Sequence, residues 1–480
     1  MSENSAPPSQ AEVAGRRLAS ARRLILPLAL AQFICSFAGS NMNVMIADIS
    51  DDLDTTVKGV QTVITLFLLI MAILMIPCSK LTDRWGRKRC FIGGLTLYGI
   101  GALLSAISPN LGVLILGNSV LEGVGTAFLI PPVYILATLW FEDITSRAWA
   151  FGVISGLGGI GAAAGPLIGG VITTGISWRA AFVFQALVVA TIIFLSRRLV
   201  DPLPPDPTRP FDAVGASLSA VGMFFVVFGI LQAGSNNLLF ALCMALGAVL
   251  LLVFFLFIRA RERTGKEPLL STGLFRNRTC NLALVTQNIQ WLLLIGSSFV
   301  VSVFLQEVRG YSAIKTGVIF TAATLGILVS SLAAERLAKR YPQRTLIIAG
   351  FVVTIAGIVL LLGLVRATDN IVAFLPGLSL IGLGLGGMLT PSVNVVQSSF
   401  PEEMQGEISG LSRSVSNLGS SFGTAIAGTI LISVVATGNR AYAIAMVTLA
   451  AIGAVGLLAA LLLPSSLSGR GSATKAPAPG

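Results

Sequence analysis

Long apolar runs follow one another along this whole sequence, and they limit the fold more than any other feature. Fourteen runs are separated by charged and turn-forming residues, and each is long enough to cross a bilayer. Because 54% of the residues are hydrophobic and only 11% are charged, water-soluble cores of ordinary size cannot bury them. We therefore predict an all-α polytopic membrane protein. The runs lie at residues 24–46, 60–78, 91–108, 111–138, 148–174, 180–196, 213–233, 238–258, 281–305, 314–334, 345–365, 371–397, 409–435 and 441–463.

The positions of lysine and arginine indicate the orientation of the runs. With the N-terminus in the cytoplasm, most of the 32 basic residues fall in inner segments. The outer loops hold only Lys58, Arg179, Arg309, Lys315, Arg366 and Arg440. Cytoplasmic loops are typically enriched in this way, so we expect fourteen transmembrane helices with both termini in the cytoplasm. Arginine outnumbers lysine, and alanine and glycine are abundant, which favours a GC-rich bacterial genome and hence the inner cell membrane.

The two longest inner loops, 197–212 and 259–279, divide the runs into groups of six, two and six. This division predicts two six-helix bundles and an inserted helix pair. The expected segments are a cytoplasmic tail at 1–23, a bundle at 24–200, the inserted pair with its loops at 201–279, a second bundle at 280–463, and a disordered cytoplasmic tail at 464–480.

Several function classes are excluded by residues that the chain lacks. The absence of histidine excludes imidazole-based metal sites and Ser-His-Asp triads. No loop is long enough for a nucleotide-binding domain, and no phosphate-binding P-loop motif occurs. The basic residues separate membrane runs, so they indicate topology and not nucleic-acid binding. We expect neither an enzyme nor a protein with a metal or an organic cofactor.

The loop after the second run reads Ser79-Lys-Leu-Thr-Asp-Arg-Trp-Gly-Arg-Lys-Arg89. A tight turn between two helices needs the backbone freedom of Gly86. Asp83 can accept hydrogen bonds from helix-terminal amides, or it can pair with Arg84 or Arg87. The alternative is a basic anchor that only fixes the topology.

The fifth run contains Gly161-Ala-Ala-Ala-Gly165-Pro166-Leu-Ile-Gly169-Gly170. Glycines four residues apart flatten one helix face and allow a neighbouring helix to approach closely. Pro166 is expected to bend the helix. Tight packing without any further role is the alternative.

These two motifs resemble the signature loop and the antiporter motif of the major facilitator superfamily. With further matches at Ser177-Trp-Arg179, Phe211-Asp-Ala-Val-Gly215, Pro268-Leu-Leu, Leu274-Phe-Arg-Asn-Arg278 and Gly310-Tyr-Ser-Ala313, the sequence is similar to the fourteen-spanner drug:proton antiporters. The resemblance implies the major facilitator fold, a proton as coupling ion and a monomer. It also implies that Asp83 and Arg87 latch the two bundles together in the outward-facing state.

The sequence departs from that family in the first and fourth helices. The first helix usually carries an aspartate, where this chain has Ala38. The fourth helix usually carries Arg-x-x-Gln-Gly, where this chain has Ser119-Val-Leu-Glu122-Gly123. An acid and a base that the family assigns to proton handling are therefore replaced, and a new acid is present.

Glu122 is the candidate for proton coupling because it is the one carboxylate in the middle of a run. An ionised carboxylate at that depth costs a few kcal/mol, so we expect it to be protonated part of the time or to face water or a partner. The alternative is a protonated glutamate that joins two helices by a hydrogen bond.

Polar stripes at helical spacing predict a substrate cavity. In the resembling fold, helices one, four, nine and twelve line the central cavity, and the stripes on these helices would converge there. Hydrogen bonding between helices is the alternative for each stripe. Arg413, near the start of the thirteenth run, is expected to reach the inner surface or to meet the loop that carries Asp83, and not to bind substrate. The candidate cavity residues are Gln32, Ser36, Ser40, Asn43, Asn118, Thr126, Gln287, Gln290, Trp291, Asn394 and Gln397.

The predicted function is proton-coupled efflux of lipophilic, often cationic, small molecules by alternating access. Uptake or uniport of a polar metabolite is an alternative in the same fold, favoured by the missing acid and base. Lipid movement, or a membrane sensor or scaffold without transport, is the alternative from another class. The expected partners are a small-molecule substrate and the lipid bilayer.

Overall fold

The computed structural model describes residues 10–141, 144–197, 199–202, 204–208, 210–233, 236–338, 340–367, 370–400, 405–432 and 439–464. Residues 1–9 of the predicted N-terminal tail and 465–480 of the predicted C-terminal tail lie outside this part of the chain. The described residues form helices and connecting loops, with no β-strand among them. Within the described residues, each of the fourteen apolar runs overlaps a helix.

The helices of the first half are α1 (Gln10–Asn41), α2 (Ile46–Asp52), α3 (Val57–Trp85), α4 (Arg87–Ala106), α5 (Leu111–Leu114), α6 (Gly123–Trp140), α7 (Ile144–Gly175) and α8 (Trp178–Ser196). A 3-10 turn, η1 (Met42–Val44), follows α1, and a π-helix, η2 (Ile115–Glu122), joins α5 to α6. Helices α9 (Ala213–Gln232) and α10 (Asn237–Arg263) come next.

The second half contains the short 3-10 turns η3 (Thr272–Arg276) and η5 (Ile371–Ala373) and the π-helix η4 (Phe304–Val308). Its helices are α11 (Arg278–Val303), α12 (Ala313–Ala338), α13 (Gln343–Ala367), α14 (Phe374–Gln397), α15 (Gln405–Ile432) and α16 (Asn439–Leu461).

Twelve helical segments of the described chain are long and apolar enough to cross a membrane, and α7 makes thirteen if its two bent parts count as one span. The 41° bend separates Gly152–Ala162 from Ala164–Gly175. Pro166 lacks the N–H that would bond to the carbonyl of Ala162, so the bend is where proline predicts it. Helix α15 has 28 residues but is not among these spans. Its serines and Arg413 lower its hydropathy.

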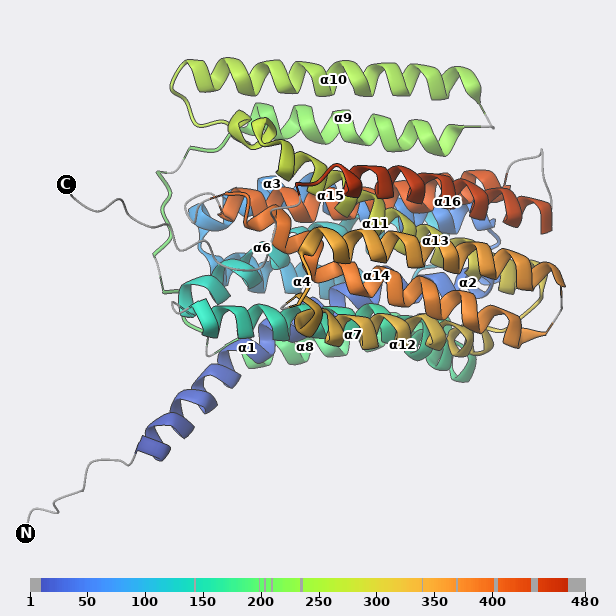
Figure 1. Ribbon diagram of the computed structural model, residues 1–480. Helices are drawn as coiled ribbons and strands as arrows, with labels where there is room; N and C mark the ends of the chain where they lie inside the picture. The colour runs from blue at the N-terminus through green and yellow to red at the C-terminus, as the bar shows by residue number, and fades with distance from the viewer. Residues whose placement is uncertain are drawn as a thin grey trace, which may run out of the picture.

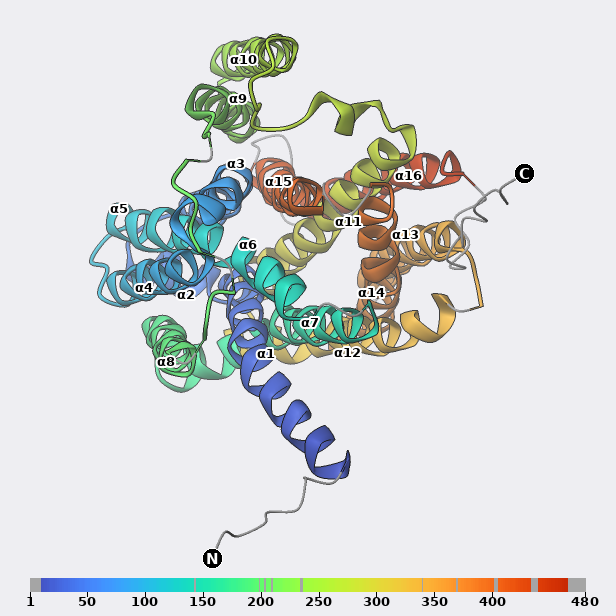
Figure 2. The same cartoon turned by 90° about the vertical axis from the view of Figure 1, so that its left-hand side faces the viewer.

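The helices form two groups with a separate pair beside them (Figures 1 and 2). Seen from the end where α1 begins, α1–α8 lie on one side and α11–α16 on the other (Figure 2). The groups meet along α3 and α15 and along α7 and α12. Helices α9 and α10 pack on each other outside this arrangement, and α9 contacts α3 and α15.

The tight turn between α3 and α4 is built on Gly86. Its φ of +95° is a conformation that side chains with a Cβ rarely adopt, as the sequence predicts for this turn. Asp201 accepts a hydrogen bond of 2.7 Å from the Arg87 N–H, one of the unpaired amides at the start of α4. Asp83 instead pairs with the Arg87 guanidinium at 2.6 Å. Among the partners that the sequence suggested for Asp83, the structure shows Arg87.

The glycines of the fifth run let α7 touch two other helices. A Cβ on Gly161 would overlap the Phe33 carbonyl oxygen of α1, and one on Gly165 would overlap Ser40. A Cβ on Gly170 would lie 2.6 Å from the carbonyl oxygen of Ala313, where α12 begins. The motif therefore packs α7 against its own group on one face and against the second group on another.

Candidate functional site

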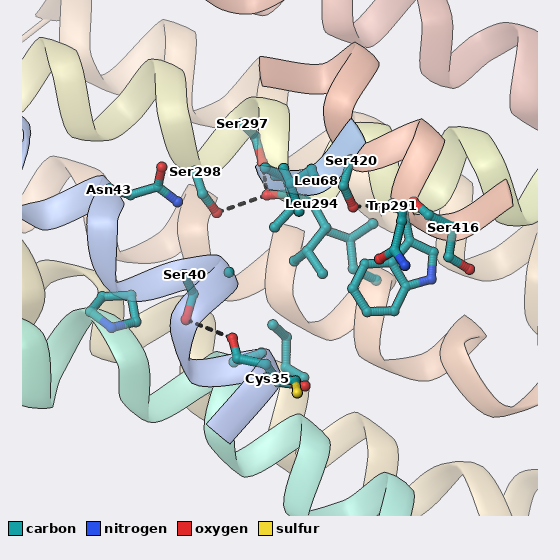
Figure 3. A pocket seen from close by; sticks show the side chains of 18 of the residues that line it. Cys35, Ser40, Asn43, Leu68, Trp291, Leu294, Ser297, Ser298, Ser416 and Ser420 are labelled. Atoms are coloured by element: carbon teal, nitrogen blue, oxygen red, sulfur yellow. Dashed lines mark hydrogen bonds between the residues drawn. The ribbon is translucent and has the colours of Figure 1, made fainter. Parts of the chain in front are cut away.

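A cavity lies where the two helix groups meet, enclosed by residues from α1, α3, α6, α7, α11, α12, α14 and α15. Figure 3 shows side chains from α1, such as Ser40 and Cys35, facing the same space as Trp291 of α11 and Ser416 of α15. Most of the wall is apolar. The polar lining residues are Gln32, Ser36, Ser40, Asn43, Ser297, Ser298, Thr324, Arg413, Ser416, Asn417 and Ser420, and the aromatic ones are Phe67, Trp291 and Phe320.

The polar stripe on α1 lines this cavity along its length. Gln32 Nε2 donates to Ser36 Oγ at 3.2 Å, and Ser40 Oγ donates to the Ser36 carbonyl at 3.2 Å. The Asn43 side chain is buried, and neither its amide nitrogen nor its amide oxygen has a hydrogen-bond partner. A buried amide without partners is unfavourable, so Asn43 is suited to bind a polar group of a ligand.

The two helix groups are joined by hydrogen bonds at the end where α2 lies. Gln306 Nε2 donates to the Asn43 carbonyl at 2.8 Å, and Ser302 Oγ donates to the same oxygen. The Ala47 N–H donates to Gln306 Oε1 at 3.2 Å. These bonds connect η1 and α2 of the first half to α11 and η4 of the second.

The opposite end carries the turn at Gly86, and we call it the basic end. There Lys80 forms an ion pair of 2.7 Å with Glu407. Ser414 Oγ also donates to the Ala72 carbonyl at 2.5 Å. Both contacts join α3 to α15. Arg87 contacts both Asp83 and Asp201. The role of Asp83 and Arg87 as an outward-facing latch stays a prediction.

Arg413 lies in the cavity wall and not at the surface where we expected its side chain. Its guanidinium donates to the hydroxyl of Tyr134 and lies 4.6 Å from the centre of the Tyr134 ring. The Tyr134 hydroxyl in turn donates to Gln32 Oε1 at 3.2 Å. This side of the cavity could have been predicted from the sequence. Like the stripe on α1, the polar residues of α15 repeat at helical spacing, at Arg413, Ser416, Asn417 and Ser420.

Five of the predicted cavity residues line the cavity, namely Gln32, Ser36, Ser40, Asn43 and Trp291. Asn118, Thr126, Gln287, Gln290, Asn394 and Gln397 are not among the lining residues. Several of the second set join helices. Gln287 hydrogen-bonds to Ser412 and Ser416, each at 3.0 Å, and so holds α11 against α15. Gln290 donates to the Leu385 carbonyl of α14 at 3.2 Å.

Glu122 is fully buried inside the first helix group, outside the cavity lining. It is the last residue of the π-helix η2, and Gly101 of α4 packs against it. Neither carboxyl oxygen makes a hydrogen bond of ordinary geometry, although Asn118, Tyr98 and Ser105 surround the group. The Tyr98 hydroxyl donates to Gln185 Oε1 instead. π-helical turns often mark functional sites.

One residue of α1 links this buried cluster to the cavity. Cys35 lines the cavity, and its buried thiol lies beside Thr126 and near Glu122. Thr126 Oγ1 donates to the Glu122 carbonyl at 2.7 Å. Cys35 therefore borders both the cavity and the cluster around Glu122.

Two groups of membrane-spanning helices around a shared central cavity are the arrangement of secondary transporters. The sequence matches the Major Facilitator Superfamily over residues 28–275, 211–424 and 284–479, and the chain belongs to this family. It is therefore not an enzyme but a multi-pass transporter of small molecules, of the kind found in bacterial inner membranes.

Drug-resistance proteins are among its relatives. The chain is 31% identical to the puromycin resistance protein pur8 of Streptomyces alboniger, over 83% of this chain and 80% of that protein. It is 29% identical to the multidrug efflux pump LfrA of Mycolicibacterium smegmatis, over 80% and 75% of the two chains. Its fold is similar to that of the peptide transporter POT in complex with sulfate, with a TM-score of 0.66, 14% identity, and 92% and 93% of the two chains covered.

Proposed function

We propose that the protein is a monomeric, proton-coupled exporter of lipophilic small molecules that works by alternating access. In this proposal all fourteen helical runs span the membrane, and the basic end and both termini face the cytoplasm. The observation that carries the proposal is the cavity between the two helix groups. Hydrogen bonds join the groups at one end of this cavity, and an ion pair joins them at the other. Breaking one set of these contacts at a time would expose the cavity to one side of the membrane.

Export of drugs is favoured by the relatives. Their names describe puromycin resistance, multidrug efflux, and tetracenomycin C resistance and export, the last in Streptomyces glaucescens at 27% identity. The mainly apolar wall of the cavity suits a lipophilic body, and the serines and amides of α1 and α15 suit a few polar groups.

Glu122 is the proposed proton site. It is buried without a basic partner among the described ion pairs, so its neutral form is favoured in the membrane. Because Glu122 does not line the cavity, substrate does not compete with the proton by direct contact. Coupling would pass through Cys35 and Thr126, which move with α1 and α6 when the cavity changes shape.

The proton gradient is sufficient for such a cycle. One proton that moves through 100 mV supplies about 2.3 kcal/mol. That free energy supports roughly a fiftyfold concentration gradient of a neutral compound. For a monovalent cation exchanged one for one, only the pH difference would drive export.

The test is proton movement in liposomes that contain the protein and an internal pH dye. We expect addition of N-phenyl-1-naphthylamine, ethidium or 1-naphthaleneacetate to evoke proton flux in the wild type for at least one probe, and Glu122→Gln to abolish it. Glu267→Gln, in an exposed loop, is the matched control. Equal proton flux in the wild type and in Glu122→Gln would support proton antiport but would show that Glu122 is not the proton site.

The alternatives from the sequence give other results in the same liposomes. Probe movement without proton flux would indicate uniport, and movement of a labelled lipid would indicate lipid transport. Binding of probes without any movement would indicate a sensor.

A further inference from the structure

The charge of the cavity wall distinguishes between classes of substrate. Among the described residues that line the cavity, Arg413 is the one with a formal charge, and none of them is an aspartate, glutamate or lysine. The preference for cations that the sequence suggested depended on a carboxylate in the cavity. Glu122, the carboxylate in question, lies behind α1 and is not in the wall.

The guanidinium of Arg413 retains donors for a ligand. A guanidinium has five N–H donors, and Arg413 uses its contact with Tyr134 alone, through the hydroxyl and the ring face. No carboxylate of the described residues forms an ion pair with it. An arginine without a counter-ion in a partly buried site attracts carboxylates, sulfonates and phosphates, with which it forms strong bidentate hydrogen bonds.

The surroundings of Arg413 complete a site for an acidic amphiphile. Asn417 lies on the same face of α15 and can offer a further amide donor, whereas the hydroxyls of Ser416 and Ser420 donate to backbone carbonyls of their own helix. Across the cavity, Trp291 of α11 and the apolar side chains of α3 and α12 form a surface for a ring or an alkyl body. A cation in the same place would be repelled by the guanidinium without a compensating carboxylate.

We propose that the transported compounds carry an acidic group, which binds Arg413, on an aromatic or apolar body. This inference rests on the proposed transport function and specifies its substrate class. Arg413 binds the acidic group directly, with the N–H donors that its contact with Tyr134 leaves free.

The test compares three probes of one size that differ in charge: 1-naphthaleneacetate, 1-naphthaleneacetamide and 1-naphthylmethylammonium. Binding to the purified protein in a non-ionic detergent is measured as a rise in the midpoint of thermal unfolding with probe concentration. We expect the acetate to bind about tenfold or more tightly than the ammonium, the effect of a charge-assisted hydrogen bond. Equal binding, preference for the ammonium, or no stabilisation by the acetate would overturn the proposal.

Variants test whether Arg413 is responsible. Arg413→Gln should remove the preference for the acetate, whereas Arg413→Lys keeps the charge and should retain most of it. Arg340→Gln removes an exposed arginine at the basic end and should leave the preference unchanged. If Arg413→Gln still prefers the acetate, Arg413 is not the residue that binds the acidic group. If this variant does not fold, the order of affinities in the wild type still tests whether the cavity prefers acids.

Two further measurements separate this inference from the transport proposal and identify the source of the acid. Binding in detergent requires no proton movement, so acetate preference without proton flux would reject the antiporter and keep the site. Proton flux evoked by ammonium probes alone would support the antiporter and reject the site for an acidic group. Displacement of the acetate by short-chain phosphatidylglycerol would assign the acidic group to a lipid headgroup, and its absence would assign it to free organic acids.

Discussion

Lys80 and Glu407 form an ion pair of 2.7 Å across the two helix groups, and each side chain is 24% exposed. Glu407 also accepts from the Ser271 N–H at 3.4 Å, so it holds the loop that follows α10 as well. One carboxylate therefore connects α3, α15 and the loops of the inserted pair at the basic end.

Loss of this pair should favour opening of the basic end. In Glu407→Gln, we expect the distance distribution between spin labels at Trp85 on α3 and Arg336 on α12 to shift toward longer values. The shift should be modest, because an ion pair at this exposure contributes about 1 kcal/mol or less. The exchanged pair Lys80→Glu with Glu407→Lys should restore the original distribution. An unchanged distribution in Glu407→Gln would show that the pair does not control this end.

The glycines of α7 allow a matched comparison of packing. Gly161→Ala places a methyl group against the Phe33 carbonyl, whereas a Cβ on Gly159 meets nothing within 4 Å. We expect Gly161→Ala to destabilise the protein by about 1–3 kcal/mol or to prevent folding, since the backbone of α1 must move. Gly159→Ala should have little effect. Thermal unfolding of the two purified variants gives the answer, and equal midpoints would contradict the close packing of α1 and α7.

Asp201 stabilises the start of α4 from a distant loop. Its carboxylate accepts from the Arg87 N–H at 2.7 Å and lies 3.7 Å from the Arg87 guanidinium. Asp201→Ala should lower the free energy of unfolding by about 1 kcal/mol, the usual effect of losing a helix cap. Asp51→Asn, at an exposed end of α2, is the control. The same stability in Asp201→Ala and wild type would mean that water replaces the cap without cost.

An ion pair at the other end of the molecule gives a pH dependence. Hydrogen bonds from Arg179 and then Trp178 hold the pKa of Asp52, which lies beyond the first membrane span, below its ordinary value of 3.8. A carboxylate with a lowered pKa in the folded protein contributes stability above its unfolded pKa and loses it as the pH falls through the folded pKa.

Asp52→Asn should therefore be slightly less stable than the wild type at pH 7, and the difference should shrink as the pH falls below 3.8, the ordinary pKa of this carboxyl group. The effect is small because the Asp52 side chain is 46% exposed. Unfolding midpoints between pH 7 and pH 3 measure the difference, with Asp54→Asn as control. A difference that does not change over this range would exclude the Asp52–Arg179 pair as its source.

The helices and their contacts by small residues could be predicted from the sequence alone. Apolar runs long enough to span a bilayer require backbone hydrogen bonds within each segment, so helices follow from composition. The turn at Gly86, the bend near Pro166 and the close approach of α7 to its neighbours follow from the properties of glycine and proline. Helix α15 is not among the segments that are apolar enough to count as membrane spans, because it is rich in serine. This helix packs against α3 and α11 and lines the cavity.

Which polar stripe faces the cavity was decided only by the tertiary structure. Helical spacing shows that residues share a face, but the direction of that face depends on how each helix is rotated against its neighbours. The π-helix that ends at Glu122 breaks the regular spacing, and the stripe of Asn118, Glu122 and Thr126 lies inside the first helix group. Arg413 had two possible environments, the aqueous surface or the cavity. Contact with Tyr134, a residue nearly 280 positions away in sequence, selects the cavity.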